Sequence, residues 1–236
     1  MADAHKKWKS HDQREPHVSL NNKKILLMGP PGCGKSTQAH SISVTYNIPH
    51  ISAGRLLKDT RDVETEYGRP SDYMERGELV PNPLVNRLVH FRVNDATEFV
   101  LEGYPRNVSQ QEYLEGVTEI NRMIVLDLPE REILERLTAR RICEDCGTIF
   151  NNDFSPPEKA GVCDRCGGNL YRRKDDRPDA VKHRFEVYEH RTRPVLERYQ
   201  KRPGFVRIDA TGTTREVWER IRSTIVELPA QTRSTV

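Results

Sequence analysis

A glycine-rich segment near the start of the chain has the residue types of a phosphate-binding loop. Residues 29 to 36 read Gly-Pro-Pro-Gly-Cys-Gly-Lys-Ser and fit the pattern G-x-x-x-x-G-K-[ST]. Glycine lets several backbone N–H groups converge on one phosphate, and the helix expected after the loop presents its positive end to the same anion. Lys35 adds a mobile cation for the β- and γ-phosphates, and Ser36 lies near the expected Mg²⁺. The predicted phosphate-binding residues are Gly29, Pro30, Pro31, Gly32, Cys33, Gly34, Lys35, Ser36 and Thr37.

Four of the five cysteines have the spacing of a metal site. Cys143-x2-Cys146 and Cys163-x2-Cys166 are separated by sixteen residues. Two such turns can place four thiolates around one Zn²⁺ in closed tetrahedral coordination, which leaves no open position for catalysis. The prediction is a structural zinc that stabilises a small insertion. Free cysteines or a redox pair are the alternatives, and iron is an alternative metal.

Arginines gather on both sides of this cysteine-rich segment. Arg136 and Arg140 precede it, four residues apart in a helical pattern, so we expect them on one helical face. Arg173 and Arg184 follow it. Guanidinium groups stabilise the charge that develops on transferred oxygens in phosphoryl transfer, so a catalytic set is one interpretation. The alternative, which composition alone favours, is a solvated helix surface with ion pairs to nearby glutamates.

Another arginine follows a predicted strand. Gly103-Tyr-Pro-Arg106 comes directly after the apolar run that ends at Glu102. Open α/β sheets bind ligands beyond the carboxyl ends of their strands, so Arg106 is predicted to hold an acceptor phosphate bidentately. Glu102 is predicted to orient water bound to Mg²⁺. The alternative for Glu102 is a strand-end carboxylate with no role.

Alternating apolar runs and helical patterns must position these residues. Strands are predicted at 24–28, 50–52, 98–102, 122–128 and 205–209, and helices at 35–46, 83–94, 109–118, 130–141, 180–201 and 214–228. The alternation indicates an α/β fold: a P-loop NTPase-type parallel five-stranded sheet flanked by helices. Two stretches interrupt it and are predicted to be small inserted domains of a core at 23–230. They are residues 53–82, expected as short helices, and residues 142–178.

Composition excludes several classes of protein. The 236 residues include 38 basic and 35 acidic side chains, and this excess of +3 is too small to indicate nucleic-acid binding. Apolar runs fall short of 18 residues and the first residues lack a secretory signal, so no membrane partner and a cytoplasmic location are expected. Residues 1–22 are predicted to be a disordered tail, with a basic tether to a partner as the alternative.

Together, the motifs resemble those of the adenylate kinase family, in particular its long form with a zinc-binding lid. The resemblance runs from about residue 24 to 228. It rests on Gly29-Pro-Pro-Gly-Cys-Gly-Lys-Ser-Thr-Gln, Ile51-Ser-Ala-Gly-Arg, Gly77-Glu-Leu-Val-Pro, Glu102-Gly-Tyr-Pro-Arg, Arg140-Arg-Ile-Cys and Arg173-Lys-Asp-Asp.

This resemblance implies a monomeric nucleoside monophosphate kinase that transfers the γ-phosphoryl group of MgATP to AMP (ATP + AMP = 2 ADP), with Mg²⁺ and structural Zn²⁺. The implied catalytic residues are Lys35, Arg106, Arg136, Arg140, Arg173 and Arg184, of which Arg136 and Arg140 also bind ATP. The implied monophosphate site is Ala53, Lys58, Val80, Gly103, Arg106, Gln110, Arg173 and Arg184, with Gln110 reading the base edge. Residues 53–82 would be the monophosphate-binding domain and 142–178 the lid, both closing to exclude water.

Several positions depart from the usual residues of that family. Ala53 stands in place of threonine, Arg55 and Glu102 in place of aspartate, and Lys58 in place of an arginine with its bidentate fork. With Asn107, which resembles the UMP/CMP kinase branch, they keep two alternatives open: a UMP/CMP kinase or other nucleotide kinase, and a catalytically weakened nucleotide-binding regulatory module. A zinc-ribbon protein that binds nucleic acid is a third alternative, disfavoured by the phosphate loop.

Overall fold

The five apolar runs of the sequence pair into one parallel sheet. Its strands are β1 (Lys24–Met28), β2 (His50–Ser52), β3 (Phe99–Glu102), β4 (Arg122–Asp127) and β8 (Phe205–Asp209), in the order β2-β3-β1-β4-β8. The predicted α/β fold is thereby confirmed. The computed structural model describes residues 23–226, so the predicted tail at 1–22 and the last residues of the predicted core, 227–230, lie outside the described residues.

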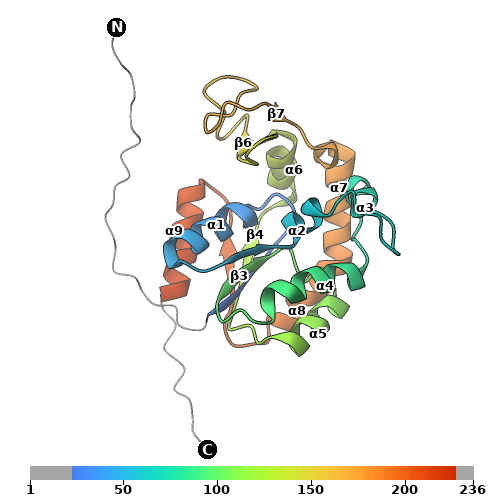
Figure 1. Cartoon of the computed structure of the whole chain (residues 1–236). Helices are drawn as coiled ribbons and strands as arrows, with labels where there is room; N and C mark the ends of the chain where they lie inside the picture. Colours follow the sequence, from blue (N-terminus) through green and yellow to red (C-terminus); the bar gives the residue numbers. More distant parts are fainter. Residues whose placement is uncertain (1–22, 227–236) are drawn as a thin grey trace, which may run out of the picture.

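Helices cover both faces of the sheet (Figure 1). Helices α1 (Lys35–Tyr46) and α9 (Thr214–Val226) lie on one face, and α4 (Asn82–Val93), α5 (Val108–Val117) and α8 (Arg193–Tyr199) on the other. Because both faces are covered, the strands are apolar on both sides rather than alternating. In β1, Ile25 and Leu27 pack into the first layer and Leu26 into the second.

The helix expected at 130–141 ends early, and this prediction is wrong at its carboxyl end. Helix α6 spans Glu130–Thr138, and Arg140–Cys143 form strand β5, antiparallel to β6 (Ile149–Asn151) and β7 (Leu170–Tyr171). Arg136 and Arg140 therefore do not share a helical face. The backbone groups of β5 form hydrogen bonds with β6 and β7, which lie farther along the chain. Local periodicity in the sequence carries no information about such distant partners.

The helix expected at 180–201 consists of three successive helical segments. Helix α7 (Pro178–Val187) passes through a π-helical turn at Tyr188–Thr192 into α8. Pro194 lies at the start of α8, where a missing backbone N–H is tolerated. Because proline cannot donate to a carbonyl in the preceding turn, the regular series of α-helical hydrogen bonds is interrupted there. In this turn, Thr192 Oγ1 donates to the carbonyl oxygen of Arg106 at 2.9 Å. The wider turn thus ties the helix to the loop after β3.

Both interrupting segments lie at the carboxyl edge of the sheet (Figure 1). Residues 53–82 contain the short helices α2 (Ala53–Asp59) and α3 (Pro70–Arg76), as expected. The other segment forms the β5–β7 lobe and ends in the 3₁₀ turn η1 (Lys174–Asp176). The two segments touch, because Lys174 Nζ lies 2.9 Å from Glu75 Oε1 on α3.

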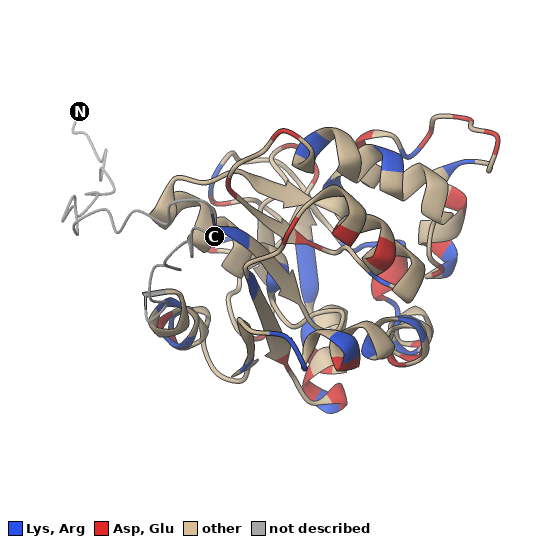
Figure 2. Ribbon diagram, turned by 90° about the horizontal axis from the view of Figure 1, so that it is seen from below, with Lys and Arg blue, Asp and Glu red and all other residues tan. Residues whose placement is uncertain are grey.

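Charges of both signs are interspersed along the helices (Figure 2). No helix within residues 23–226 is long and apolar enough to cross a membrane.

Core burial predicts where the fold is most sensitive. Ile124 in β4 is fully buried, so Ile124→Ala is expected to lower the free energy of unfolding by about 2–5 kcal/mol. Val44→Ala on α1, where the side chain is 68% exposed, is the control and is expected to change it by less than about 0.5 kcal/mol. Urea unfolding measures both, and equal losses would contradict the buried position of β4.

Candidate active site

The loop between β1 and α1 wraps around its own lysine. Gly29, Gly32 and Gly34 adopt φ angles of 139°, 81° and 94°, which residues with a Cβ atom rarely adopt. A Cβ at Gly29 would also collide with the carbonyl oxygen of Leu126. Lys35 Nζ donates to the carbonyl oxygens of Gly29 at 2.8 Å and Pro30 at 2.7 Å. The loop therefore presents a cation and the N-terminus of α1 at the carboxyl edge of the sheet.

Cys33 is packed inside this loop. Its side chain is 1% exposed, and Sγ lies 3.6 Å from Lys35 Nζ. Burial raises the pKa of the thiol, although the neighbouring ammonium group acts in the opposite direction. These features favour a small filler residue over a reactive thiol.

A buried carboxylate lies beside the loop. Glu102 Oε1 accepts hydrogen bonds from Ser36 Oγ at 3.0 Å and from Ser52 Oγ, and His50 Nε2 lies 3.7 Å away. Burial alone would raise the pKa of Glu102, but His50, Ser52 and the charge of Lys35 outweigh it and lower the pKa to about 2. An ionised carboxylate beside a hydroxyl group suits Mg²⁺, so the residues present fit the predicted magnesium environment.

Sequence reasoning missed His50 and Ser52. The register between β2 and β3 places Ser52 opposite Glu102. The signal was available, because both residues belong to a predicted strand whose carboxyl end must meet the same sheet edge as Glu102.

Three of the predicted arginines converge on two aspartates. Arg140 donates to Asp176 at 2.8 and 2.6 Å, and Arg173 donates to Asp175 at 2.7 and 2.6 Å. Arg184 Nη1 lies 3.2 Å from one carboxylate oxygen of each. Burial alone would raise the pKa of Asp175, but the charges of Arg184 and Arg173 lower it. Three guanidinium groups against two carboxylates leave an excess positive charge held in place.

Arg136 lies in a different setting from Arg140. Its Nη2 donates to the carbonyl oxygens of Ala210 at 3.1 Å and Gly212 at 3.3 Å, and lies 3.4 Å from Glu132 Oε2. The ion pair with Glu132, the kind of surface contact expected in the alternative interpretation, is therefore longer than both hydrogen bonds to backbone carbonyls. The backbone after β8 fixes this guanidinium group beside the phosphate loop.

The residues predicted for the acceptor lie around the carboxyl end of β3. Arg106 Nε donates to the carbonyl oxygen of Gly103 at 2.8 Å. Gln110 is 2% exposed, and its Oε1 accepts from the backbone N–H of Arg106 at 2.7 Å. Lys58 and Val80 face the same space from the segment at 53–82.

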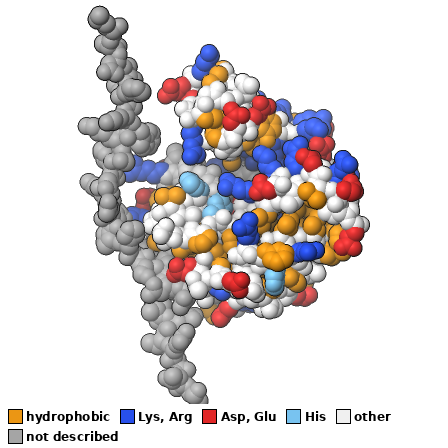
Figure 3. Space-filling view, in the orientation of Figure 1, with side chains coloured by type: hydrophobic (Ala, Val, Ile, Leu, Met, Phe, Trp, Pro, Cys, Tyr) orange, Lys and Arg blue, Asp and Glu red, His pale blue; other side chains and the backbone are white. Residues whose placement is uncertain are grey.

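One cleft of 1790 Å³ brings these groups together. All six residues predicted to be catalytic line it, namely Lys35, Arg106, Arg136, Arg140, Arg173 and Arg184. Figure 3 shows Lys and Arg side chains gathered below the β5–β7 lobe, over this region. Among the described residues, Pro30 and Ala53 are predicted binding residues that are buried and do not line it. Arg55 and Arg61 line the cleft without having been predicted as site residues.

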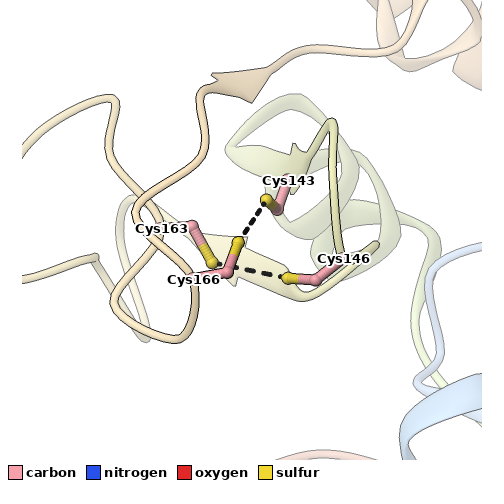
Figure 4. A group of neighbouring side chains, drawn as sticks. All are labelled: Cys143, Cys146, Cys163 and Cys166. Carbon is pink, nitrogen blue, oxygen red and sulfur yellow. Dashed lines mark hydrogen bonds between the residues drawn. The ribbon is translucent and has the colours of Figure 1, made fainter.

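The remaining four cysteines meet in the β5–β7 lobe (Figure 4). Cys143 Sγ lies 3.4 Å from Cys166 Sγ, Cys146 Sγ lies 3.6 Å from Cys163 Sγ, and all four lie within 4.8 Å of one another. Tetrahedral Zn–S bonds of about 2.3 Å place sulfur atoms about 3.8 Å apart, so this cluster fits one Zn²⁺.

Comparison with known proteins gives consistent similarities. A sequence model of the adenylate kinase family matches residues 27–203. Proteins named adenylate kinase are similar over most of their length. That of Haloarcula marismortui is 43% identical over 211 residues, covering 87% of this chain and 98% of the relative. That of Halobacterium salinarum is 40% identical over 216 residues (89% and 100%), and that of Pyrococcus horikoshii 38% over 205 residues (84% and 93%).

The low pKa of Glu102 predicts a pH-dependent contribution to stability. Its pKa is about 2 in the folded chain against 4.5 ordinarily, so the contribution is complete above pH 4.5 and is lost as the pH falls towards 2. Its size is at most about 3 kcal/mol. Glu102→Gln is expected to flatten the loss of unfolding free energy between pH 5 and 3, measured by urea unfolding, whereas Glu119→Gln at an exposed position keeps the wild-type slope. Parallel curves for all three proteins would refute the assignment.

The cysteine cluster predicts one zinc ion per chain in protein purified under reducing conditions. Cys143→Ser is expected to lose the metal and to lower the melting temperature far more than the turnover at saturating substrate, because a closed site stabilises the lobe without taking part in chemistry. Cys33→Ala, the control, keeps the metal. Elemental analysis and thermal unfolding test this, and metal-free wild-type protein would contradict it.

Proposed function

The chain belongs to the adenylate kinase family, and on that premise we propose that it transfers the γ-phosphoryl group of MgATP to AMP (ATP + AMP = 2 ADP). The observation that carries the proposal is the convergence of Lys35 and five arginines on a single cleft beside a phosphate loop. Such a concentration of cations suits a highly charged anionic ligand, and two nucleotide phosphate chains are ligands of that kind.

The proposed roles follow from position. Loop N–H groups and Lys35 bind the β- and γ-phosphates of ATP, and Arg136 lies beside the loop on the same side. Arg140, Arg173 and Arg184, held by Asp175 and Asp176, neutralise the charge that spreads over the transferred oxygens. Guanidinium groups of this kind contribute roughly 10³–10⁵ in rate.

On the acceptor side, Arg106 binds the phosphate of AMP and Gln110 meets the edge of the base. The acceptor phosphate is already anionic, so direct in-line transfer needs no strong general base. Positioning and charge neutralisation then supply most of the acceleration. Ser36 and Glu102 would hold Mg²⁺, which supplies further positive charge at the β- and γ-phosphate oxygens.

We assign the domains as a kinase core at 23–230 with a monophosphate-binding domain at 53–82 and a zinc lid at 142–178. Lys174 contacts Glu75, so the two inserted segments already meet in this conformation. In our proposal they separate to admit the substrates and close again over them. Closure would exclude water and suppress ATP hydrolysis. Action as a cytoplasmic monomer without nucleic-acid or membrane partners stays a prediction from the sequence.

The acceptor assignment rests on Gln110, because Ala53 is buried and Lys58 offers a single ammonium group in place of a fork. A UMP/CMP kinase is the second candidate, favoured by Asn107. A coupled assay with ATP and AMP, CMP, UMP or GMP tests both. AMP is expected to give the highest kcat/KM. Exclusive use of CMP or UMP would replace the AMP assignment, and binding without turnover would support the regulatory module.

The phosphate loop yields the direct mutational test. Lys35→Met is expected to lower kcat by about 10²–10³-fold and to weaken ATP binding, because a fixed positive charge at the transferred group is lost. Lys201→Met, at an exposed position, is the matched control and is expected to keep wild-type kinetics. Unchanged turnover and ATP affinity in Lys35→Met would overturn the proposed function.

A further inference from the structure

Three side-chain amides meet where α4 and α5 begin. Asn82 is the first residue of α4, Asn107 caps the N-terminus of α5, and Gln110 lies in the first turn of α5. Asn82 Oδ1 accepts from Asn107 Nδ2 at 2.8 Å and from Gln110 Nε2 at 2.9 Å. Asn82 Nδ2 lies 3.4 Å from Asn107 Oδ1. An amide turned by 180° has nearly the same shape, so its hydrogen-bond partners alone decide which end carries oxygen.

Two backbone N–H groups fix the orientation of all three amides. The N–H of Gln110 donates to Asn107 Oδ1 at 2.9 Å, and that of Arg106 donates to Gln110 Oε1 at 2.7 Å. A backbone N–H only donates, so both acceptors must be oxygen. Asn107 and Gln110 therefore both turn their NH2 groups towards Asn82, which must answer with its oxygen. Reversing any one amide would set two donors or two acceptors against each other.

The two asparagines lie behind Gln110 with respect to the cleft. Gln110 lines the large cleft, whereas Asn82 and Asn107 line a separate cavity of 640 Å³ between this corner and α7 and α8. The asparagines are therefore placed to act on a nucleotide through Gln110.

A fixed amide distinguishes two classes of base. Gln110 has two N–H hydrogens and two lone pairs on its amide oxygen, and its contacts with Asn82 and Arg106 use one of each. One donor and one acceptor remain, in a fixed order. Adenine presents the N1 acceptor beside the N6 amino donor, whereas a 6-oxo purine presents an N1–H donor beside an O6 acceptor, the reverse order. A glutamine that turns freely would accept either base.

We propose that Asn82 and Asn107 are positioning residues that set a preference for amino bases over oxo bases, by holding the amide of Gln110 in one orientation together with the Arg106 N–H. The inference rests on the proposed function, since it takes the acceptor to be a nucleoside monophosphate bound beside Gln110. Buried polar groups matched to one ligand reject the mismatched ligand strongly, because its groups leave them unpaired.

Two variants with the same change of charge separate the alternatives. Asn107→Asp keeps an oxygen to cap α5 but removes the NH2 group that donates a hydrogen bond to Asn82 Oδ1. Turning Asn82 to meet the new acceptor sets its NH2 group against that of Gln110. The contact with Asn82 then favours the reversed amide while the Arg106 N–H still favours the original one, so two orientations of Gln110 compete. Asn82→Asp is the matched control, because a carboxylate still accepts from both donors and gives up only the longer contact of 3.4 Å with Asn107 Oδ1.

The measurement is kcat/KM for AMP and for inosine monophosphate, which carries a 6-oxo group, at saturating ATP, together with calorimetric binding of both. Wild-type protein is expected to prefer AMP by at least about tenfold, the size of one bidentate base contact. Asn107→Asp is expected to lower this preference about tenfold, and Asn82→Asp to keep it within about twofold. Asn107→Ser, which also retains a cap, serves if Asn107→Asp does not fold. It removes the donor that orients Asn82 without forcing Asn82 to turn, so a smaller loss of preference in the same direction is expected.

If the asparagines had a purely structural role, their substitution would lower kcat/KM for both substrates in parallel. An unchanged preference for AMP in the Asn107 variants therefore overturns the inference. A loss of preference in Asn82→Asp as large as in Asn107→Asp also overturns it. Binding keeps this result apart from the proposed function. Preferential AMP binding that is lost in Asn107→Asp without any phosphoryl transfer would support the inference and refute the kinase activity. Turnover of AMP with the same preference over inosine monophosphate in wild-type protein and in Asn107→Asp would support the kinase activity and refute the inference.

Discussion

Repulsion among the cations of one cleft is the constraint on which the rest of the structure depends. Lys35 and five arginines face the same space, and each would drift towards water without a partner. Asp175 and Asp176 hold three of the guanidinium groups, and backbone carbonyls hold Arg136 and Lys35. Buried charge is tolerated when it is paired and hydrogen-bonded. These partners keep the cations in place before a ligand arrives, so phosphate binding requires little further ordering of side chains.

The parallel sheet supplies the fixed edge on which these partners stand. Loops after β1, β2 and β3 leave the sheet at the same side, which brings the phosphate loop, Ser52 and Glu102 into contact. The β5–β7 lobe carries Arg140 on a strand and leads into Arg173, yet it contributes few apolar residues to a core of its own. Four cysteines at metal-binding distance provide the stabilisation that such a small unit cannot draw from apolar burial.

Two kinds of interaction recognise the two parts of a nucleotide: charged groups bind its phosphates, and neutral hydrogen-bonding groups contact its base. Guanidinium groups bind phosphates of any nucleotide, so they determine the class of ligand and carry no information about its base. The amides of Asn82, Asn107 and Gln110 are neutral, and their orientation follows from two backbone N–H donors. In our proposal, selection among bases depends on that orientation.

Local patterns in the sequence determined the phosphate loop, the cysteine pairs, the five strands and most helix positions, because each of these is specified by residues close together in the chain. Tertiary structure alone decided that α6 ends at Thr138, since the partners of β5 lie farther along the chain. It also decided which carboxylates face the arginines, that His50 lies beside Glu102, and which way Gln110 turns. These outcomes depend on pairings between residues up to about fifty positions apart. Spacing along the sequence indicates which chemical groups are available, whereas the register of strands and the direction of hydrogen bonds decide which of them meet.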